Sequence, residues 1–269
     1  MTTPAPHRRP VSIALSIALS LAAASAWAQA APPAPAAVAP AAPEATTATW
    51  GAGLLLSAEV SPYRGVGSEV RLLPVLQFEN PWVRVFGPVI DLKLHDAESR
   101  HLALRLRYAD TGYEAKDSAF LAGMAERKNS VWLGAKGEWR NGIGQLSGEW
   151  LADASGHSKG QQLKVVAETL KHVGPVGIVP RLGLVWQDRK YVDYHFGVDA
   201  SEARAGREVH AGKAALSTEI GVRLLHRLAP QQSVFLDLSA TALGSAIQDS
   251  PLVDRRWVSA ARLGYVYRF

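Results

Sequence analysis

The residue types best suited to acyl-transfer chemistry lie together in one short stretch, Gly156-His157-Ser158-Lys159. A catalytic serine needs a base that a third group holds in place, and a hydrogen-bond donor for the oxyanion. The sequence brings no such groups to this stretch. We therefore interpret it as a solvated turn rather than a catalytic site.

Other reaction chemistries have no stronger support. The histidines are scattered without the spacing of a metal site, and the chain contains no cysteine. The carboxylates of Asp96, Glu98 and Asp153 are interpreted as solvated loop charges. The Gly-x-Gly sequences at 51–53 and 142–144 do not open a helix after a strand, so they are not phosphate-binding loops. The sequence predicts no catalytic residue, no cofactor and no metal.

Charged residues instead recur at every second position of longer segments. In the segment from Arg100 to Asp110, Arg105 and Arg107 alternate with Leu104 and Leu106. A period of two is that of a β-strand. The segment therefore predicts a strand with one apolar face and one charged face.

Eleven segments show this alternation, and turn-forming residues separate them. They span residues 50–59, 69–79, 82–94, 100–110, 130–140, 145–153, 162–171, 178–189, 213–228, 233–246 and 257–269. This spacing predicts an all-β chain.

Two all-β architectures share the pattern and place the apolar face on opposite sides. A soluble sandwich or lipocalin-like barrel buries it, whereas an outer-membrane barrel turns it toward lipid. Many segments are long enough to cross the hydrocarbon, and tryptophans such as Trp82, Trp139 and Trp257 lie near segment ends. A one-residue shift would point Arg105 and Arg107 into lipid, at about 2–4 kcal/mol each. These features favour a transmembrane, antiparallel outer-membrane β-barrel.

The N-terminal part of the chain has a different composition. Residues 1–28 carry a basic pair, an apolar run and small residues, which predicts a cleaved secretory signal peptide. Residues 29–49 are rich in Ala and Pro and predict a disordered linker, and residues 50–269 form the expected barrel. The signal contains two of the 29 basic residues and none of the 24 acidic ones, so the mature net charge is 27 minus 24, or +3. So mild a charge argues against a nucleic-acid partner.

The charged faces of the strands are expected to line the barrel lumen. Their members are Arg105, Arg107, Lys136, Glu138, Arg140, Lys164, Glu168, Arg181, Glu219, Arg223 and Arg262. The basic residues could form an anion-leaning pore. The alternative that we favour is that they pair with acidic residues and so fill a small barrel. The expected acidic partners are Glu138, Glu149, Glu168, Glu219 and Asp237.

The C-terminus lies within a strand pattern that holds Tyr265, Tyr267 and Phe269. In a closed barrel the last strand must pair with the first, because lipid does not tolerate a free edge. The Tyr-x-Tyr-x-Phe ending also resembles the signal that the outer-membrane assembly machinery recognises. Eleven segments conflict with the even strand number of bacterial barrels. We predict twelve strands, with ten as the alternative, and place the miscounted strand before Arg100 or inside a long loop.

Four long connections alternate with short turns, so we expect them at the same, outward-facing end. They span residues 111–128, 154–160, 190–212 and 247–256. Within the first of them, residues 118–127 are expected to form either a short helix over the lumen or a simple surface loop.

Several motifs, in chain order, resemble those of the MipA/OmpV family of outer-membrane proteins. Ser61-Pro62-Tyr63 with Gly65 and Pro74 resembles the start of the family. The segment with Asp117, Ser118, Leu121, Gly123, Met124 and Arg127 resembles its "DS..L.GM..R" pattern. Three later blocks are similar as well: Asp153 with Ser155, Gly156 and Gly160; Phe196-Gly197-Val198; and Ser250-Pro251-Leu252-Val253. The chain departs from the family at His195-Phe196, where paired tyrosines are usual.

The resemblance implies a barrel that acts mainly as a scaffold, since one family member is described as bridging a lytic transglycosylase and a peptidoglycan synthase. Our leading hypothesis is thus a non-enzymatic scaffold for the cell-envelope machinery, embedded in outer-membrane lipid and lipopolysaccharide. A narrow channel with a basic lumen is the alternative, and a lipid-modifying outer-membrane enzyme is the least favoured. The short turns near Asn80, Asn141 and Pro230 and the linker are the accessible surfaces for a periplasmic partner.

Overall fold

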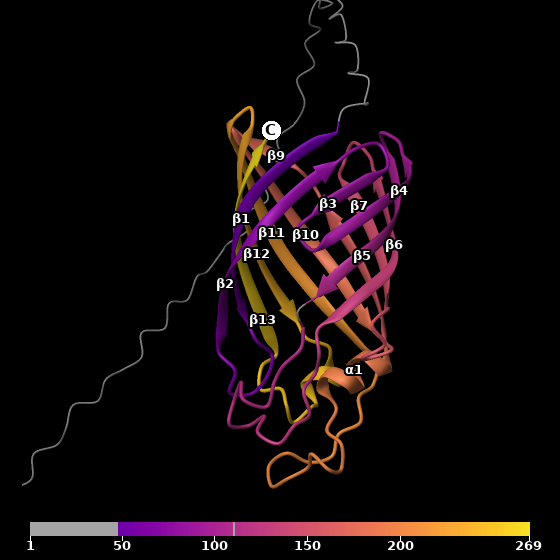
Figure 1. Cartoon of the computed structure of the whole chain (residues 1–269), viewed down its shortest axis with the longest axis vertical. Helices are drawn as coiled ribbons and strands as arrows, with labels where there is room; N and C mark the ends of the chain where they lie inside the picture. Colours follow the sequence, from indigo (N-terminus) through magenta and orange to yellow (C-terminus); the bar gives the residue numbers. More distant parts are fainter. Residues whose placement is uncertain (1–47, 110) are drawn as a thin grey trace, which may run out of the picture. The chain divides into compact units, whose positions relative to one another are not determined.

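The computed structural model of the chain describes residues 48–109 and 111–269. The expected signal peptide, residues 1–28, and the expected linker as far as residue 47 lie outside the described residues. The described strands form one continuous antiparallel sheet (Figure 1). The strands are β1 (Thr49–Val60), β2 (Ser68–Glu79), β3 (Val83–Phe86), β4 (Val89–Asp96), β5 (Arg100–Ala109), β6 (Ser130–Arg140), β7 (Gln145–Asp153), β8 (Gln161–Glu168), β9 (Lys171–Val173), β10 (Val176–Gln187), β11 (Ala215–Ala229), β12 (Gln232–Ala242) and β13 (Trp257–Arg268).

The sheet closes on itself. Strands that follow one another in the chain pair with each other, except that β8 and β9 both pair with β10. β13 pairs with β1 from Gly51–Arg268 to Glu59–Ala260. The backbone amide of Phe269 donates to the carbonyl of Trp50 at 2.9 Å, which extends this pairing to the last residue. The prediction that the final strand pairs with the first is therefore confirmed.

Closure gives twelve strand positions around the barrel, as predicted. β8 and β9 share one position, because both pair with the same strand, β10, at different heights. The missing strand lies before Arg100, as expected. The segment 82–94 is not one strand but the hairpin of β3 and β4, which turns at Gly87 and Pro88, and Gly87 has a positive φ of 53°. Because this turn has only two residues, the alternation resumes almost at once and conceals the break.

The outward face of the barrel is apolar. On β5, Leu102, Leu104 and Leu106 are exposed, whereas Arg105 between them forms ion pairs inside the barrel. A soluble barrel has its apolar residues inside and its charged residues outside. Here the two faces are exchanged, which is the arrangement that hydrocarbon requires. Neither of the helices in the described residues is long and apolar enough to cross a membrane.

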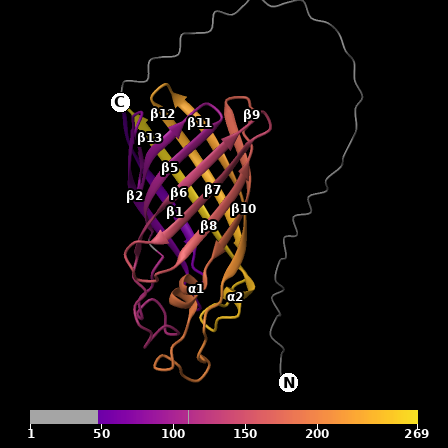
Figure 2. The ribbon, with the colours of Figure 1, turned by 90° about the vertical axis from the view of Figure 1, so that its right-hand side faces the viewer.

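The four long connections, which we expected at the outward-facing end, pack into a cap at one end of the barrel (Figures 1 and 2). We call them the outward loops. The cap contains α1 (Arg189–Phe196) and α2 (Ser245–Gln248). Its buried core includes residues from loops far apart in the sequence, among them Tyr63, Leu121, Val192, Ile247 and Leu252. Trp132 and Leu243, which point inward at the ends of their strands, belong to the same core. Their apolar side chains are therefore explained by the cap that lies above the charged lumen.

Helix α1 was not predicted from the sequence. Asp188 caps it by accepting a hydrogen bond from the Tyr191 amide at 2.8 Å. Asp188 is the one local signal that could have located the helix. Residues 118–127 form neither of the two expected structures: they are a series of turns that buries Leu121 and Met124 in the cap core.

His195 lies on the buried face of α1, with 1% of its surface exposed. Neither ring nitrogen has a hydrogen-bond partner among the described residues. Burial, assisted by the positive charge of Arg127, lowers the pKa of His195 to about 4. The folded cap therefore holds this side chain neutral at neutral pH.

We expect the cap to loosen as the pH falls. When the cap opens, His195 regains its ordinary pKa near 6.5, so the open form binds a proton more readily. The stabilising contribution is complete above pH 6.5 and decreases between pH 6.5 and about 4, by about 2 kcal/mol at pH 5. Hydrogen exchange of the α1 amides at pH 7 and pH 5, corrected for the intrinsic rates, measures this change.

His195→Phe provides the control, because it keeps the packing and removes the titrating group. Its α1 amides should show the same protection at both pH values. Equal protection at both pH values in the unmodified protein would contradict the assignment to His195.

Candidate functional site: the charged lumen

The lumen holds ion-pair clusters, and the first of them is centred on Arg105. The guanidinium of Arg105 on β5 contacts Asp91 on β4 at 2.7 Å and also pairs with Glu149 on β7. Arg107, two residues further along β5, contacts the other oxygen of Glu149 at 2.8 Å. The two arginines of β5 are thus neutralised by one carboxylate from β4 and one from β7.

A second cluster has the same design on the other strands. Arg181 on β10 contacts Glu219 on β11 at 3.0 Å and Asp237 on β12 at 2.8 Å. Lys164 adds a second contact to Glu219 at 2.7 Å, and Arg223 adds one to Asp237 at 2.8 Å. A β-carbon on Gly221 would lie 2.7 Å from Cζ of Arg181, so the glycine leaves room for the guanidinium.

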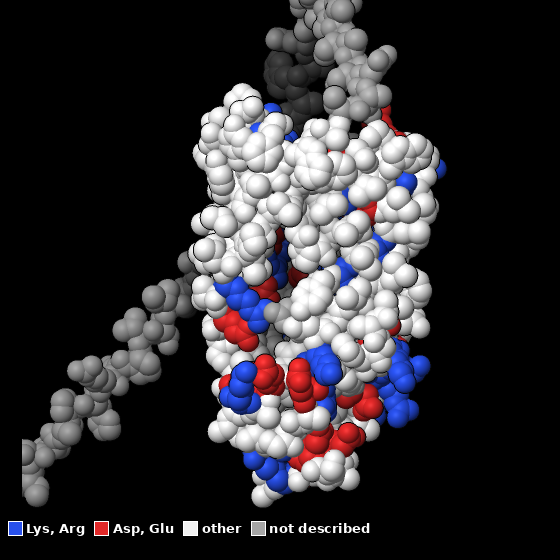
Figure 3. All heavy atoms as spheres, viewed as in Figure 1, with Lys and Arg blue, Asp and Glu red and all other residues white. Residues whose placement is uncertain are grey.

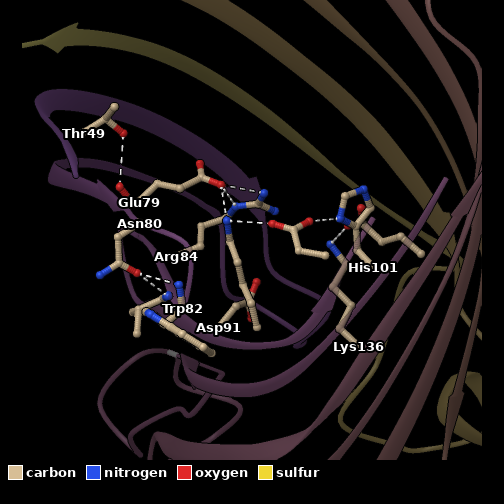
Figure 4. A network of polar contacts seen from close by, with 12 residues as sticks. Thr49, Glu79, Asn80, Trp82, Arg84, Asp91, His101 and Lys136 are labelled. Carbon is tan, nitrogen blue, oxygen red and sulfur yellow. Dashed lines mark hydrogen bonds and ion pairs between the residues drawn. The ribbon is translucent and has the colours of Figure 1, made fainter. Parts of the chain in front are cut away.

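A third cluster lies beside the β3–β4 hairpin (Figure 4). Glu79 accepts hydrogen bonds from Arg84 and Lys93, each at 2.8 Å, and Lys93 also contacts Asp96 at 3.0 Å. Asp96 in turn pairs with His101. Sequence reasoning missed this cluster, because the hairpin was taken for a single strand and its inward positions were therefore misplaced.

The remaining predicted lumen residues have separate partners. Glu138 pairs with Lys136 and lies 3.1 Å from Arg140, while Arg262 on β13 donates to Glu59 on β1 at 3.0 Å. Glu168, which was expected to form an ion pair, accepts a hydrogen bond from Gln145 at 3.3 Å instead. Sequence reasoning also missed Glu59 and Asp91 as partners, since only the register between strands brings them beside Arg262 and Arg105.

The clusters surround a cavity of about 1230 Å³. Among the described residues, its lining comes from the strands and from the short turns at the end opposite the cap, with none from α1 or from the long outward loops. Each of the eight basic residues predicted to line the lumen forms at least one ion pair. These eight cations are therefore compensated by carboxylates within the barrel.

Apart from Pro74 in β2, the residues that carry the family resemblance lie at the cap end rather than in the lumen. Ser118 donates to the carbonyl of Arg64 at 2.9 Å, and a β-carbon on Gly65 would lie 3.2 Å from that of Ser118. Tyr63 forms a β-bridge with Val253. Ser61, Pro62, Leu121, Gly123, Met124, Arg127, Gly197, Ser250 and Pro251 lie in loops at the same end.

Arg127 ties two of these loops together inside the cap. Its guanidinium contacts Glu202 at 3.0 Å and donates to the carbonyl of Tyr194 at 2.6 Å. Burial acts to raise the pKa of Glu202, but hydrogen bonds from Arg127 and from the amides of Ala125 and Asp199 outweigh it and lower the pKa. Glu202 was not identified from the sequence, because it lies 75 residues from its partner.

The serine and histidine of the 156–159 stretch do not act on each other. Ser158 donates to Asp153 at 2.8 Å, and Nδ1 of His157 lies 3.0 Å from the carbonyl of Asn129. Asp153 also accepts hydrogen bonds from the amides of Ser155, Gly156, Ser158 and Lys159. These contacts are those of a tight turn around one carboxylate. Within residues 48–109 and 111–269, no group of three or more acidic or histidine side chains could hold a metal ion.

Comparison with known proteins identifies relatives with the same design. The family model described as "MltA-interacting protein MipA" matches residues 51–269. The outer membrane protein OmpV of Vibrio cholerae is 28% identical over 61% of this chain and 65% of its own length. The MltA-interacting protein of Escherichia coli K12 is 24% identical over 77% of this chain and 85% of its own length. This chain thus matches slightly less than two thirds of OmpV.

Solved barrels are similar at lower identity. The NanC porin is 9% identical, with a TM-score of 0.43, over 80% of this chain and 98% of its own length. An outer membrane channel from Pseudomonas putida F1 is 14% identical, with a TM-score of 0.43, over 83% of this chain and 96% of its own length. The match of the family model across the whole barrel is decisive. The chain belongs to the MipA family, and it is a twelve-stranded β-barrel of the outer membrane.

Proposed function

We propose that this protein is a non-enzymatic scaffold that holds a lytic transglycosylase at the outer membrane, with a peptidoglycan synthase as a further partner. The observation that carries the proposal is the capped interior of the barrel, in which ion pairs hold the charged side chains against the wall. Ion pairs between nearby strands line the lumen, and an apolar core closes its outer end. Such an interior favours a rigid body over a transport path.

The family supports the choice of partner. The Escherichia coli relative is named for its interaction with MltA. The proposal extends that partner to this chain and adds the expected signal peptide, residues 1–28, as the means of export. The expected linker, residues 29–49, increases the distance over which the protein can contact the partner.

Two turns at the end opposite the cap offer a docking surface. In each, the side-chain Oδ1 of an asparagine accepts hydrogen bonds from the amides two and three residues further on: Asn80 from Trp82 and Val83, and Asn141 from Ile143 and Gly144. The turns are thereby fixed, and each presents a large apolar side chain. Trp82 is 71% exposed and Ile143 is 84% exposed. Apolar side chains held outward on rigid turns are suited to a protein partner.

Ile143→Asp tests this surface. We expect it to weaken binding of an MltA-type lytic transglycosylase about tenfold or more, because the partner would have to bury an unpaired charge in place of an apolar anchor. Binding is measured with the full-length barrel in detergent or vesicles and the transglycosylase from the same organism.

Val209→Asp is the matched control. Val209 is also exposed, but it lies in an outward loop at the cap end. Loss of binding in this variant alone would move the interface to the opposite side, and unchanged binding in Ile143→Asp would remove the turns from it.

Conductance in planar bilayers distinguishes the scaffold from a narrow channel, the alternative that the cavity of about 1230 Å³ favours. We expect silent membranes, because the cap core closes the outer end and ion pairs hold the eight predicted lumen cations. Steady current steps that change in Arg105→Ala would instead support the channel.

The ion pairs of the lumen should also contribute strongly to stability. Arg181 and Arg223 both contact Asp237 at 2.8 Å, but the Arg181 side chain is 8% exposed and that of Arg223 is 44% exposed. We expect Arg181→Met to lower the free energy of unfolding by about 3 kcal/mol, because it removes the central cation from two carboxylates. Arg223→Met should cost less than about 1 kcal/mol. Denaturant unfolding in vesicles measures both, and equal costs would contradict the central role of Arg181.

A further inference from the structure

The barrel wall has an opening beside β2. This strand pairs with β1 along its whole length, but β3 pairs with it only at Gln77–Glu79. One further hydrogen bond joins the amide of Gly87 to the carbonyl of Leu76 at 3.0 Å. In the described residues, no strand pairs with Ser68–Val75 on that side. Figure 3 shows the wall hollowed in this region, with charged atoms of the interior visible through the hollow.

The opening has a defined frame, and we call it the side window. It is bounded by Ser68–Val75 of β2, by the β3–β4 turn at Gly87 and Pro88, and by the end of β5. The contact between Ser118 and Arg64 closes it on the cap side. Residues 68–74 of β2 are all exposed, including those that point inward. The window therefore connects the apolar outer surface with the lumen.

The exposed edge of β2 is not suited to an added strand. The carbonyl of Leu76 points toward the window, and alternate residues of a strand direct their backbone groups to the same side. The backbone groups of Val70, Leu72 and Pro74 therefore also point toward the window. Pro74 has no amide hydrogen, and proline occupies strand edges that remain unpaired. Pro74 lies at the end of this edge next to β3, so the pairing of another chain could not continue directly from the β3–β2 ladder.

On the cap side of the window, the inward positions of β2 carry the ion pair of Glu69 and Arg71. Farther from the cap, the lumen wall becomes apolar. Leu73 points inward at the window and is 43% exposed. The apolar surface continues across neighbouring strands to the other side of β1. Its further members, which all line the cavity, are Leu55, Phe86, Val89, Phe235 and Val266. We call these six residues the inner apolar patch. Barrel interiors are ordinarily polar, so a continuous apolar surface that begins at an opening to lipid suits an alkyl chain.

A cation lies beside this patch. Arg107 is the register partner of Val89, next to the turn that borders the window. Its Nη1 contacts Glu149 at 2.8 Å, whereas its buried Nε has no hydrogen-bond partner in the described part of the chain. The guanidinium therefore retains a donor for a further acceptor.

We propose that the side window and the inner apolar patch form a binding site for a single-chain anionic amphiphile from the surrounding lipid. The acyl chain lies along the patch, and the acidic head group accepts from Arg107. The lipid-facing opening selects an apolar chain, the interrupted edge disfavours a protein strand, and the guanidinium selects an anion. This site lies away from the turns that we propose for the envelope partner, so the two proposals are independent.

Site-specific fluorescence quenching tests the proposal, since the chain contains no cysteine and accepts one label at a chosen position. Leu55→Cys places a small fluorophore on the inner apolar patch, and Ser147→Cys places one on the cavity wall formed by β7. The full-length protein is reconstituted in phosphatidylcholine vesicles and titrated with lysophosphatidylglycerol that has a brominated acyl chain. We expect saturable quenching at position 55 and little at position 147.

The head-group contact is tested in the Leu55→Cys protein. Arg107→Gln should weaken the apparent affinity by roughly tenfold or more, because a hydrogen bond to a charged group is lost. Arg227→Gln is the matched control: Arg227 lines the same cavity near the turn between β11 and β12, and its removal should change nothing. Brominated lysophosphatidylcholine should bind more weakly than the anionic probe. Heat-dependent gel mobility verifies that each variant is folded.

Three results would overturn the proposal. The first is an unquenched label at position 55 at probe contents that quench a label on Leu54→Cys, which faces outward. The second is saturable quenching that is identical in the Arg107→Gln and Arg227→Gln variants. The third is shielding of the position 55 label by an added polypeptide and by neither lipid. This result would favour the addition of a strand at the window.

Discussion

The structure depends on one constraint: hydrocarbon cannot hydrogen-bond to the backbone or stabilise a charge. The constraint explains the closed sheet, because every strand that faces lipid must find its backbone partners in its neighbours. It also explains why the leucines of β5 face outward while Arg105 and Arg107 face inward. The pairing of β13 with β1 and the final hydrogen bond of Phe269 complete the sheet.

Reversing the two faces leaves an interior full of charge, and the chain resolves this in two ways. In the lumen, Arg105 and Arg181 each bridge two carboxylates from other strands. At the outer end, the loops supply an apolar core of the kind found in soluble proteins, in which His195 stays neutral and Arg127 is paired with Glu202. The motifs of the MipA family lie mainly in this second region. In this chain, their residues are thus explained by packing of the cap.

The edge of β2 is the place where the constraint is relaxed. Unpaired backbone at membrane depth is tolerated where it borders a polar cavity rather than lipid alone, and the side window opens onto such a cavity. Pro74 reduces the number of unpaired donors there. The short β3–β4 hairpin therefore has two effects. It keeps the strand number even, and it leaves Ser68–Val75 of β2 without a neighbour on one side.

The sequence by itself determined the class of fold, because a period of two and the placement of charge along single strands are local properties. The outward and inward faces and the closure at Phe269 followed from that pattern. The strand number did not, because the pattern showed eleven segments and the prediction of twelve came from the rule that bacterial barrels have even numbers. Only the tertiary structure decided which residues meet. The pairing of Arg105 with Asp91, the pairing of Arg127 with Glu202 and the assembly of the cap core depend on strand register and on loops far apart in the chain. The sequence could not reveal the side window either. The window exists because the β3–β4 hairpin covers only part of β2, and a linear pattern contains no information on where neighbouring strands end relative to each other.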